Sequence, residues 1–283
     1  MAGKTKKTAH TEPWLQLPGI LQGPAQHHWQ NYVQAAEAAG VRLPIDPGFR
    51  ACACRVFAIS DFVAGLCHRS PVLLADLLDS GDLLADSWPG VMGRRVVEQL
   101  AACANEPALH QMLRQLRQRE MLRIAWRDLA GWATLEETLR DLSELADACI
   151  RGALDRLSVW QAKETPAPLG VNRQPLPLIV LAMGKLGAHE LNFSSDIDLI
   201  FTYPDSAVTR RRNSLSAEQY FTRLGQSVIQ ALSKLDQDGF VYRVDMRLRP
   251  YGDAGALVCS FEAMEEYYQS QGREWERYAM IKA

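Results

Sequence analysis

A proline-rich break divides this chain into two halves with different hydrophobic patterns. The stretch KETPAPLGVNRQPLP, at residues 163–177, holds four prolines and one glycine, which is typical of a linker or a long loop. Before the break, apolar residues recur at helical spacing, and after it short apolar runs of strand length appear. The pattern predicts an α+β chain, with an all-helical domain at residues 25–163 and a small α/β domain at residues 164–283.

The first half has the pattern of a series of amphipathic helices. One stripe follows the i, i+3, i+7, i+10 spacing of a single packed helix and consists of Val56, Ile59, Val63 and Leu66. Residues 1–24 open with the basic stretch MAGKTKKTAH, and we expect them to form a disordered or extended tail. No apolar segment follows the basic stretch, so it does not have the form of a secretory signal.

Composition and charge argue against several classes of partner. The net charge of −2 gives the whole molecule no attraction for nucleic acid, and no apolar run approaches the roughly 18 residues that cross a bilayer. The six cysteines include no C-x-x-C pair, so small buried thiols are favoured over a metal site. We therefore expect a soluble, cytoplasmic protein that binds neither nucleic acid nor a membrane.

The second half alternates strands with helices. Ser216 and Gln219 are spaced as a capping box at the start of one helix. In chain order we predict a strand at 178–183, a strand at 197–203, a helix at 216–235, a turn at Asp238 and Gly239, a strand at 242–248, and two helices near 261–271 and 273–283.

Two acids stand at the start of the second predicted strand, in the segment AMGKLGAHELNFSSDIDLIF. Asp196 and Asp198 are two residues apart, so their carboxylates point to the same side of a strand. The other face belongs to Ile197, Leu199 and Phe201, which anchor the strand in a core. Two like charges side by side repel each other, and a cation between them relieves that repulsion. Carboxylate oxygens suit Mg²⁺, so the pair predicts a metal site.

A third acid lies in the segment FVYRVDMRLRP. Asp245 shares one face of the predicted strand with Arg243 and Arg247, while apolar residues take the other face. If this strand pairs beside the first, Asp245 joins the acid pair, and the arginines can address phosphate oxygens. Metals and cations around phosphates are the parts that a phosphoryl or nucleotidyl transfer needs. An acid pair alone on a strand is more often a solvated edge, but the third acid between arginines favours a catalytic site.

Other polar features near the acids have simpler interpretations. The turn Gly184-Lys185-Leu186-Gly187 follows the first predicted strand and matches neither a P-loop nor a dinucleotide-binding motif. Glycine lets the backbone approach a phosphate, so we interpret this turn and the acids as parts of one candidate site. We interpret the charge run at residues 210–212 as a solvated loop, His189 as a surface residue and Glu190 as structural.

The segment AMGKLGAHELNFSSDIDLIF resembles the signature G-M-G-K-L-G-G-x-E-L-N-x-S-S-D-I-D-L of the glutamine synthetase adenylyltransferase/adenylyl-removing enzymes. The stretches VYRVDMRLRPYGDAGALVCSFEAMEEYY and REWERYAMIKA are similar to downstream segments of that family. Helical stretches beginning at VFAISDFVAGLCHRSPVLLADLL extend the resemblance to about residues 55–283. Ala182 and Ala188 stand where the family signature has glycine.

The resemblance implies a nucleotidyltransferase fold for residues 164–283, with a mixed sheet and flanking helices. Members of the family are bifunctional and far longer than this chain, with one domain that removes AMP from a tyrosine of glutamine synthetase and a second that adds it. The sequence NFSSDIDL resembles that of the N-terminal, adenylyl-removing domain. The expected reaction is therefore phosphorolysis, in which phosphate releases ADP from adenylylated glutamine synthetase.

The resemblance also implies site residues, a cofactor and partners. The expected catalytic and metal-binding residues are Asp196, Asp198 and Asp245, holding Mg²⁺, with Mn²⁺ as an alternative. The expected partners are adenylylated glutamine synthetase, the PII signal protein, phosphate and the nucleotides ADP, ATP and AMP. The expected nucleotide- and phosphate-binding residues are Gly184, Lys185, Ser195, Arg243 and Arg247.

Two other functions remain open at this stage. The same acids would serve ATP-dependent adenylylation of glutamine synthetase, and the chain could also be a docking or regulatory fragment without turnover. We expect a catalytic domain truncated at its C-terminal end. Trp275 and Tyr278 would then leave apolar surface exposed near residues 275–283.

Overall fold

The computed structural model describes residues 12–205, 215–236 and 239–283. Helices account for 62% of these described residues, and the strands form one small mixed sheet, which confirms the α+β class. The charge run at 210–212 and Asp238 of the predicted turn lie outside the described residues.

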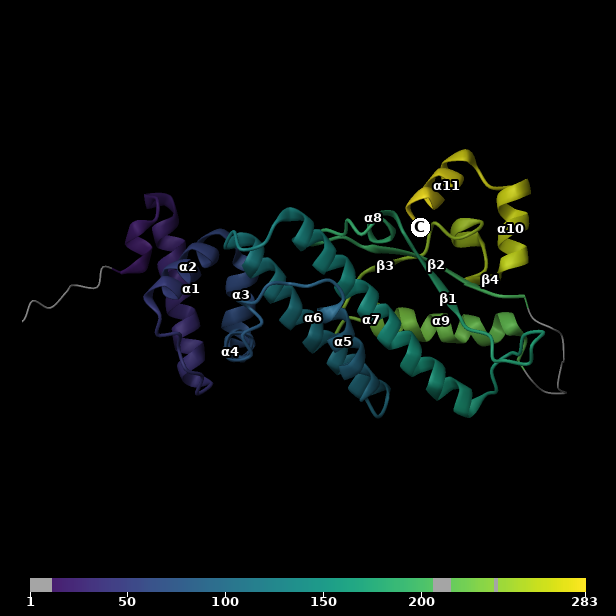
Figure 1. Ribbon diagram of the computed structural model, residues 1–283, viewed down its shortest axis with the longest axis horizontal. Coiled ribbons are helices and arrows are strands. Elements are labelled where there is room, and N and C mark those ends of the chain that lie inside the picture. The colour runs from purple at the N-terminus through teal and green to yellow at the C-terminus, as the bar shows by residue number, and fades with distance from the viewer. Residues whose placement is uncertain (1–11, 206–214, 237–238) are drawn as a thin grey trace, which may run out of the picture. The chain divides into compact units, whose positions relative to one another are not determined.

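The chain divides into two compact units, each built from two stretches of sequence. Unit 1 comprises residues 1–86 and 118–138, and unit 2 comprises residues 87–117 and 139–283. Two long helices, α6 (Glu106–Leu129) and α7 (Leu135–Glu164), contribute to both units (Figure 1). The bounds of these two units differ from those of the two predicted domains. The predicted domain boundaries stay a prediction.

Unit 1 is helical and has an aromatic core. The ring of Phe57 lies 5.7 Å from Tyr32 and 5.7 Å from Trp126, and Trp126 stacks on Phe49 at 5.3 Å. Edge-to-face and stacked rings add to the stability that burial provides. The elements of unit 1 before α6 are η1 (Pro13–Gln16), α1 (Gly19–Ala38), α2 (Pro47–Ile59), α3 (Asp61–Arg69) and α4 (Pro71–Asp79).

Two expectations for unit 1 were wrong. The extended tail does not reach residue 24, because α1 begins at Gly19 and continues through Pro24 so that Ala25 and Trp29 enter the core. The single helix across residues 56–66 is interrupted at Ser60, whose hydroxyl accepts a hydrogen bond from the Val63 amide at 3.3 Å and caps α3. A serine side chain that bonds the backbone in this way starts a new helix.

Among the described residues, no single helix is long and apolar enough to cross a bilayer, and α2 and α3 reach that length and apolarity only as a pair bent by 115°.

In unit 2, α5 (Val91–Ala101) and parts of α6 and α7 accompany a four-stranded sheet. The central strand β2 (Ile197–Tyr203) pairs antiparallel with β1 (Ile179–Met183) and parallel with two short strands, β3 (Val244–Asp245) and β4 (Val258–Ser260). The predicted strands at 178–183 and 197–203 are thus confirmed, and the proline-rich stretch between α7 and β1 forms a loop.

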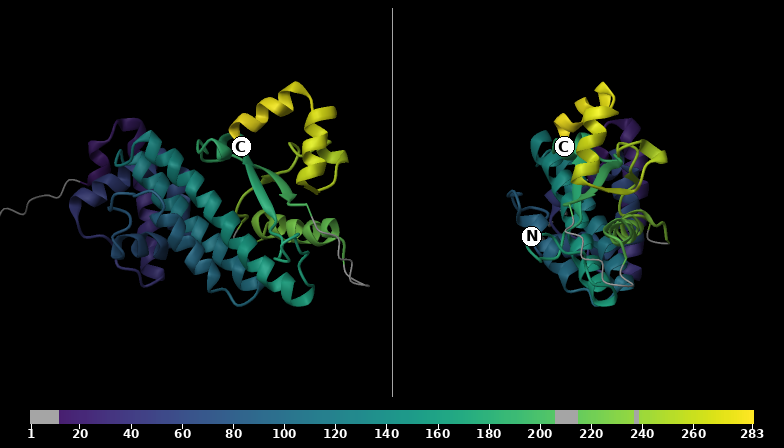
Figure 2. Two further views of the ribbon diagram at one scale, coloured as in Figure 1. Left: turned by 45° about the vertical axis from the view of Figure 1, so that its right-hand side comes forward. Right: turned by 90° about the vertical axis from the view of Figure 1, so that its right-hand side faces the viewer.

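The two faces of β2 are covered by different helices. On one face Tyr203 stacks on Phe221 of α9 (Ala217–Ser233), with ring centroids 4.8 Å apart. On the other face Ile200 forms a cluster with Met183 and Met264 of α10 (Phe261–Ser270), and Met280 packs against that cluster. Figure 2 shows α9 on one side of the strands and the yellow C-terminal helices on the other. The capping box of Ser216 and Gln219 is present at the start of α9.

The predicted strand at 242–248 was largely wrong, since only Val244 and Asp245 pair with β2. After Asp245 the chain turns, because the Arg247 amide donates to the Asp245 carboxylate at 2.8 Å instead of to a neighbouring strand. An aspartate that bonds the amide two residues later makes a local turn and ends the ladder.

The helix predicted near 261–271 corresponds to α10, and the one near 273–283 corresponds to α11 (Glu274–Ala279) followed by the short η3 (Met280–Lys282). Trp275, Tyr278 and Ile281 have 51%, 71% and 76% of their surface exposed, which confirms the expected apolar surface.

Candidate active site

The centre of the site is a pair of aspartates held in register by parallel strands. Asp198 of β2 is paired directly with Asp245 of β3, and on its other side with Met183 at the end of β1. Paired residues of adjacent strands point to the same face of a sheet. The two carboxylates therefore lie side by side, on the face that also carries Ile200.

Asp196 stands just before β2 and is held by Arg243. The Arg243 guanidinium forms an ion pair with Asp196, and it donates a second bond to the Ser194 carbonyl at 2.7 Å. The backbone carbonyl of Arg243 in turn accepts from the Ile197 amide at 2.9 Å. These contacts fix the entry to β2, and they use an arginine from the β3 segment to do so.

Asp245 is held by Arg247. The guanidinium donates to both carboxylate oxygens, with Nη2 at 2.5 Å from Oδ2 and Nε at 3.1 Å from Oδ1. A forked pair of this kind is the strong geometry for arginine and carboxylate. The Asp245 side chain is 15% exposed, whereas that of Arg247 is 74% exposed.

The glycine turn lies against the acids. The chain leaves β1 through Gly184, whose φ of +61° belongs to the left-handed region that favours glycine. A Cβ at this position would stand 3.2 Å from the Asp198 carboxylate. The turn forms the short helix α8 (Gly184–Gly187), and Lys185 from it donates to the Asn192 side chain at 3.3 Å.

Asn192 joins the glycine turn to the turn before the acids, and sequence reasoning missed it. Its Oδ1 accepts from Lys185 and also from the Ser195 hydroxyl. The next residue back, Leu191, donates its amide to the buried Ser143 hydroxyl of α7 at 3.0 Å. Only the position of Asn192 between the two turns in the sequence could have pointed to this bridging role.

The predictions for the flanking residues agree with the structure. His189 is exposed, with 70% of its side chain accessible. Glu190 forms an ion pair with Lys282 at 2.9 Å, a contact between the segment after α8 and η3. Five of the six cysteines are buried, and Cys259 is half-buried.

Charge makes the two paired aspartates unequal. Burial and the charges of Asp245 and Asp196 raise the pKa of Asp198, against the opposing effect of Arg247 and Lys185. The hydrogen bonds and charge of Arg247 lower the pKa of Asp245. An excess of negative charge thus concentrates at Asp198, where a cation would relieve it.

The acids suit a divalent cation in type, although two of them are engaged by arginines. Among the residues that the structure describes, no three His, Cys, Asp or Glu side chains form a ready-made metal site. The convergence of Asp196, Asp198 and Asp245 on one ion therefore stays a prediction. Hard carboxylate oxygens on a single face are nevertheless the donors that Mg²⁺ takes.

Comparison with known proteins places these residues in a family. A sequence model of the family described as glutamate-ammonia ligase adenylyltransferase matches residues 51–283, most of the chain and all of the acids. The chain belongs to the glutamate-ammonia ligase adenylyltransferase family. The resemblance seen in the sequence is thus confirmed.

Curated members of the glutamate-ammonia ligase adenylyltransferase family are similar to nearly the whole chain. The bifunctional glutamine synthetase adenylyltransferase/adenylyl-removing enzyme of Nitrosococcus oceani is 48% identical over 269 residues, which cover 94% of this chain and 28% of that protein. The enzymes of the same name from Pseudomonas aeruginosa and Shewanella woodyi are 52% and 42% identical over 231 and 268 residues, and the matches cover 24% and 28% of those proteins. The chain thus spans about a quarter of the length of these relatives.

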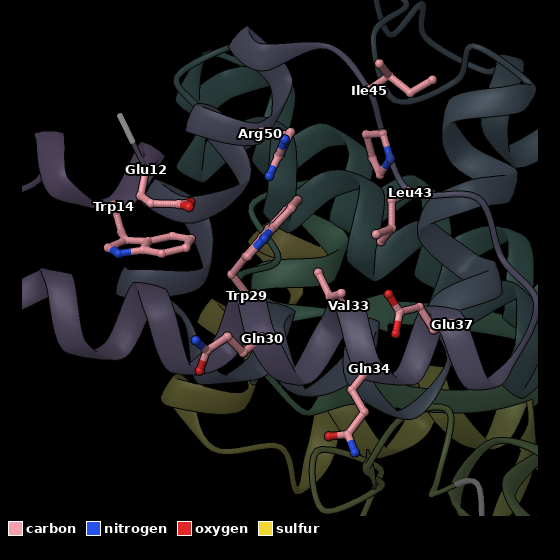
Figure 3. Close-up of a pocket in the computed structure, with 11 residues that line it drawn as sticks. Glu12, Trp14, Trp29, Gln30, Val33, Gln34, Glu37, Leu43, Ile45 and Arg50 are labelled. Atoms are coloured by element: carbon pink, nitrogen blue, oxygen red, sulfur yellow. The ribbon is translucent and has the colours of Figure 1, made fainter. Parts of the chain in front are cut away.

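Unit 1 carries a separate pocket of about 570 Å³. Figure 3 shows Trp14, Trp29 and Arg50 around it, with the carboxylates of Glu12 and Glu37 at its wall, and the Arg50 guanidinium lies 5.4 Å from the Trp29 ring centroid. Its lining residues, 12–50, precede the segment that the family model matches. The mixture of two acids, one base and two indoles does not select one class of ligand.

Proposed function

We propose that this chain is a metal-dependent nucleotidyltransferase that removes AMP from an adenylylated tyrosine of glutamine synthetase by phosphorolysis. The observation that carries the proposal is the register pair of Asp198 and Asp245 beside Asp196, with an arginine on each side. The names of the relatives supply the substrate, because they join adenylylation and adenylyl removal in one protein.

The reaction needs two anions to approach one another. An oxygen of hydrogen phosphate attacks the adenylyl phosphorus, the bond from phosphorus to the tyrosine oxygen breaks, and the phosphate proton passes to the phenolate, which gives ADP and free tyrosine. Tyrosine has a pKa of about 10, so its oxygen leaves without a dedicated acid. The main task of the site is therefore to bring the two anions together, which requires positive charge from side chains and from a bound metal ion.

The residues of the site divide this work. Asp196, Asp198 and Asp245 would hold Mg²⁺ or Mn²⁺, which neutralises phosphate charge and orients the attacking oxygen when bound. Gly184 lets the backbone come close to a phosphate, and Lys185 and Ser195 are turned toward each other by Asn192. Arg243 and Arg247 carry the guanidinium groups that recognise phosphate oxygens.

The direct test uses adenylylated glutamine synthetase, Mg²⁺ and inorganic phosphate. We expect the chain to release ADP in proportion to the phosphate added. As a matched control, Asp253→Asn alters an exposed acid that lies 3.5 Å from Arg249 and outside the acid pair, and it should leave the rate unchanged. Turnover that proceeds without phosphate and yields AMP would show that the reaction is hydrolysis and not phosphorolysis.

A second reaction mixture decides the direction. Unmodified glutamine synthetase with ATP and Mg²⁺ would be labelled if the chain worked as an adenylyltransferase, and we expect no label. We extend the proposal to the PII signal protein as a regulatory partner and to the cytoplasm as the location, both on the strength of the family. Pull-down of PII by the intact family enzyme, with this chain as competitor, tests the first of these.

A further inference from the structure

We infer that Arg247 competes with the divalent cation for Asp245 and moves to phosphate when the cation binds, so that cation and phosphate bind cooperatively. This inference rests on the proposed function, because it assumes that both ligands use the acid pair. It adds an exchange of partners that the residues of the site themselves suggest.

The contacts of Asp245 leave no oxygen free. Oδ1 accepts from the Arg247 amide at 2.8 Å and from Nε at 3.1 Å, while Oδ2 accepts from Nε at 2.9 Å and Nη2 at 2.5 Å. A cation that is to use Asp245 must displace the guanidinium. Each oxygen already accepts two hydrogen bonds, as many as it has lone pairs, and loss of the guanidinium leaves Oδ2 open and only the backbone amide on Oδ1.

Arg247 is free to make this movement. Its side chain is 74% exposed, and the side-chain bonds that the structure shows for it all go to Asp245. A swing into solvent therefore breaks one ion pair and little packing. The guanidinium that is released stays beside the site, where the oxygens of a bound phosphate match its forked geometry.

Arg243 shows the contrasting arrangement. It bonds Asp196 and the Ser194 carbonyl, and its guanidinium lies 5.9 Å from the centroid of the Phe240 ring. These three partners come from two segments of the chain, the turn before β2 and the stretch before β3, and hold it in place. The site thus has one fixed arginine and one exchangeable arginine.

The exchange has a measurable thermodynamic consequence. Without phosphate, the cation must separate Arg247 from Asp245, so it binds weakly. With phosphate, the freed guanidinium gains a new partner, and each ligand strengthens the binding of the other by the same factor. Couplings of this kind are typically of about 5- to 150-fold, and a forked ion pair on a carboxylate that is only 15% exposed places this one toward the lower end, at about tenfold.

The experiment measures Mn²⁺ binding to the chain by the loss of the free-ion EPR signal, with and without inorganic phosphate, against a protein-free blank. We expect phosphate to tighten Mn²⁺ binding to the wild-type chain about tenfold. Arg247→Gln should bind Mn²⁺ about tenfold more tightly without phosphate and show little further gain with it. Arg247→Lys keeps the charge but loses the fork, so it should lie between the two.

Arg223→Gln is the matched control. It removes another exposed arginine, with 54% of its side chain accessible, from an ion pair with Glu164 in the same unit, and it should behave as wild type. The inference is overturned if Arg247→Gln leaves Mn²⁺ affinity unchanged, or if the phosphate effect persists in it. The proposed function fails separately, if wild type and Asp198→Asn bind Mn²⁺ equally poorly under every condition.

Discussion

The two faces of β2 have different roles, although they belong to one strand. Toward α9, Ile197, Leu199 and Phe201 are at most 1% exposed. Toward the C-terminal helices, Ile200 is equally buried, but Asp198 at the start of the strand is only partly covered and carries a raised pKa. We infer that one face of β2 and the far end of the other face stabilise the fold, while the start of the strand is available for chemistry. Substitutions on the two faces should therefore separate activity from stability.

The largest effect is expected at Asp198. Asp198→Asn keeps the shape and removes a negative charge from the acid pair, and we expect turnover to fall by about a thousandfold, as loss of a metal's several kcal/mol of charge stabilisation implies. Rate measurement and thermal unfolding of the same sample make the test.

Stability should move the other way. The folded-state pKa of Asp198 is raised, so ionisation at neutral pH costs the folded state free energy, and the amide removes that cost. We expect a Tm that is unchanged or slightly higher. A clear decrease in Tm would mean that the charged end of the strand also stabilises the fold, which would contradict the division of roles between the two faces of β2.

The matched change on the sealed face is Phe201→Ala. Phe201 is 1% exposed and packs against Gly225 of α9, where an added Cβ would come within 2.8 Å of the ring. We expect a loss of about 3–5 kcal/mol in the free energy of unfolding. Urea denaturation measures it. Full activity in the fraction that remains folded would support the division of roles between the two faces of β2. An unchanged midpoint of urea denaturation would contradict it.

A smaller effect is expected at Gly184. Gly184→Ala introduces a side chain at a φ of +61° and places its Cβ 3.2 Å from the Asp198 carboxylate. We expect a loss of about 1–2 kcal/mol of stability from backbone strain. Gly90→Ala is the control for strain alone, because Gly90 has a φ of +78° and open space around it. Turnover should fall in Gly184→Ala and not in Gly90→Ala. Equal activity of the two variants would show that the glycine turn is not part of the site.

The smallest effect is a difference in titration between the paired aspartates. Carboxyl ¹³C NMR should show Asp198 titrating above the ordinary aspartate range and Asp245 below it. Mn²⁺ binding should then weaken first as the pH falls through the raised Asp198 pKa, while Asp245 stays ionised. The Asp245 pair stabilises the fold above the ordinary aspartate pKa, and that contribution is lost as the pH falls through the lowered value. Identical titration curves would show that Arg247 does not favour one acid.

The sequence allowed the central strand to be predicted with its bounds, because the apolar alternation and the acid pair each identify a face. The capping box at Ser216 was equally readable, since both partners are local. The short β3 was not, because Asp245 bonds the backbone two residues later and ends the ladder.

The residues of the candidate site could be named from the sequence, but their pairing could not. Alternation places Arg243 and Arg247 near the acids, yet either arginine could have taken either carboxylate. The structure gives Arg243 to Asp196 and Arg247 to Asp245. Asn192 was missed because an amide between two turns has no periodicity to mark it.

The order of pairing around β2 has a consequence for how the chain folds. Met183 and Asp198 are close in sequence and meet in an antiparallel pair, so β1 and β2 can find each other at low entropic cost. Asp245 comes 47 residues after Asp198, and its parallel strand must wait until the intervening α9 has crossed over. The third acid is therefore expected to arrive late, so that a chain with only β1 and β2 paired holds two of the three acids.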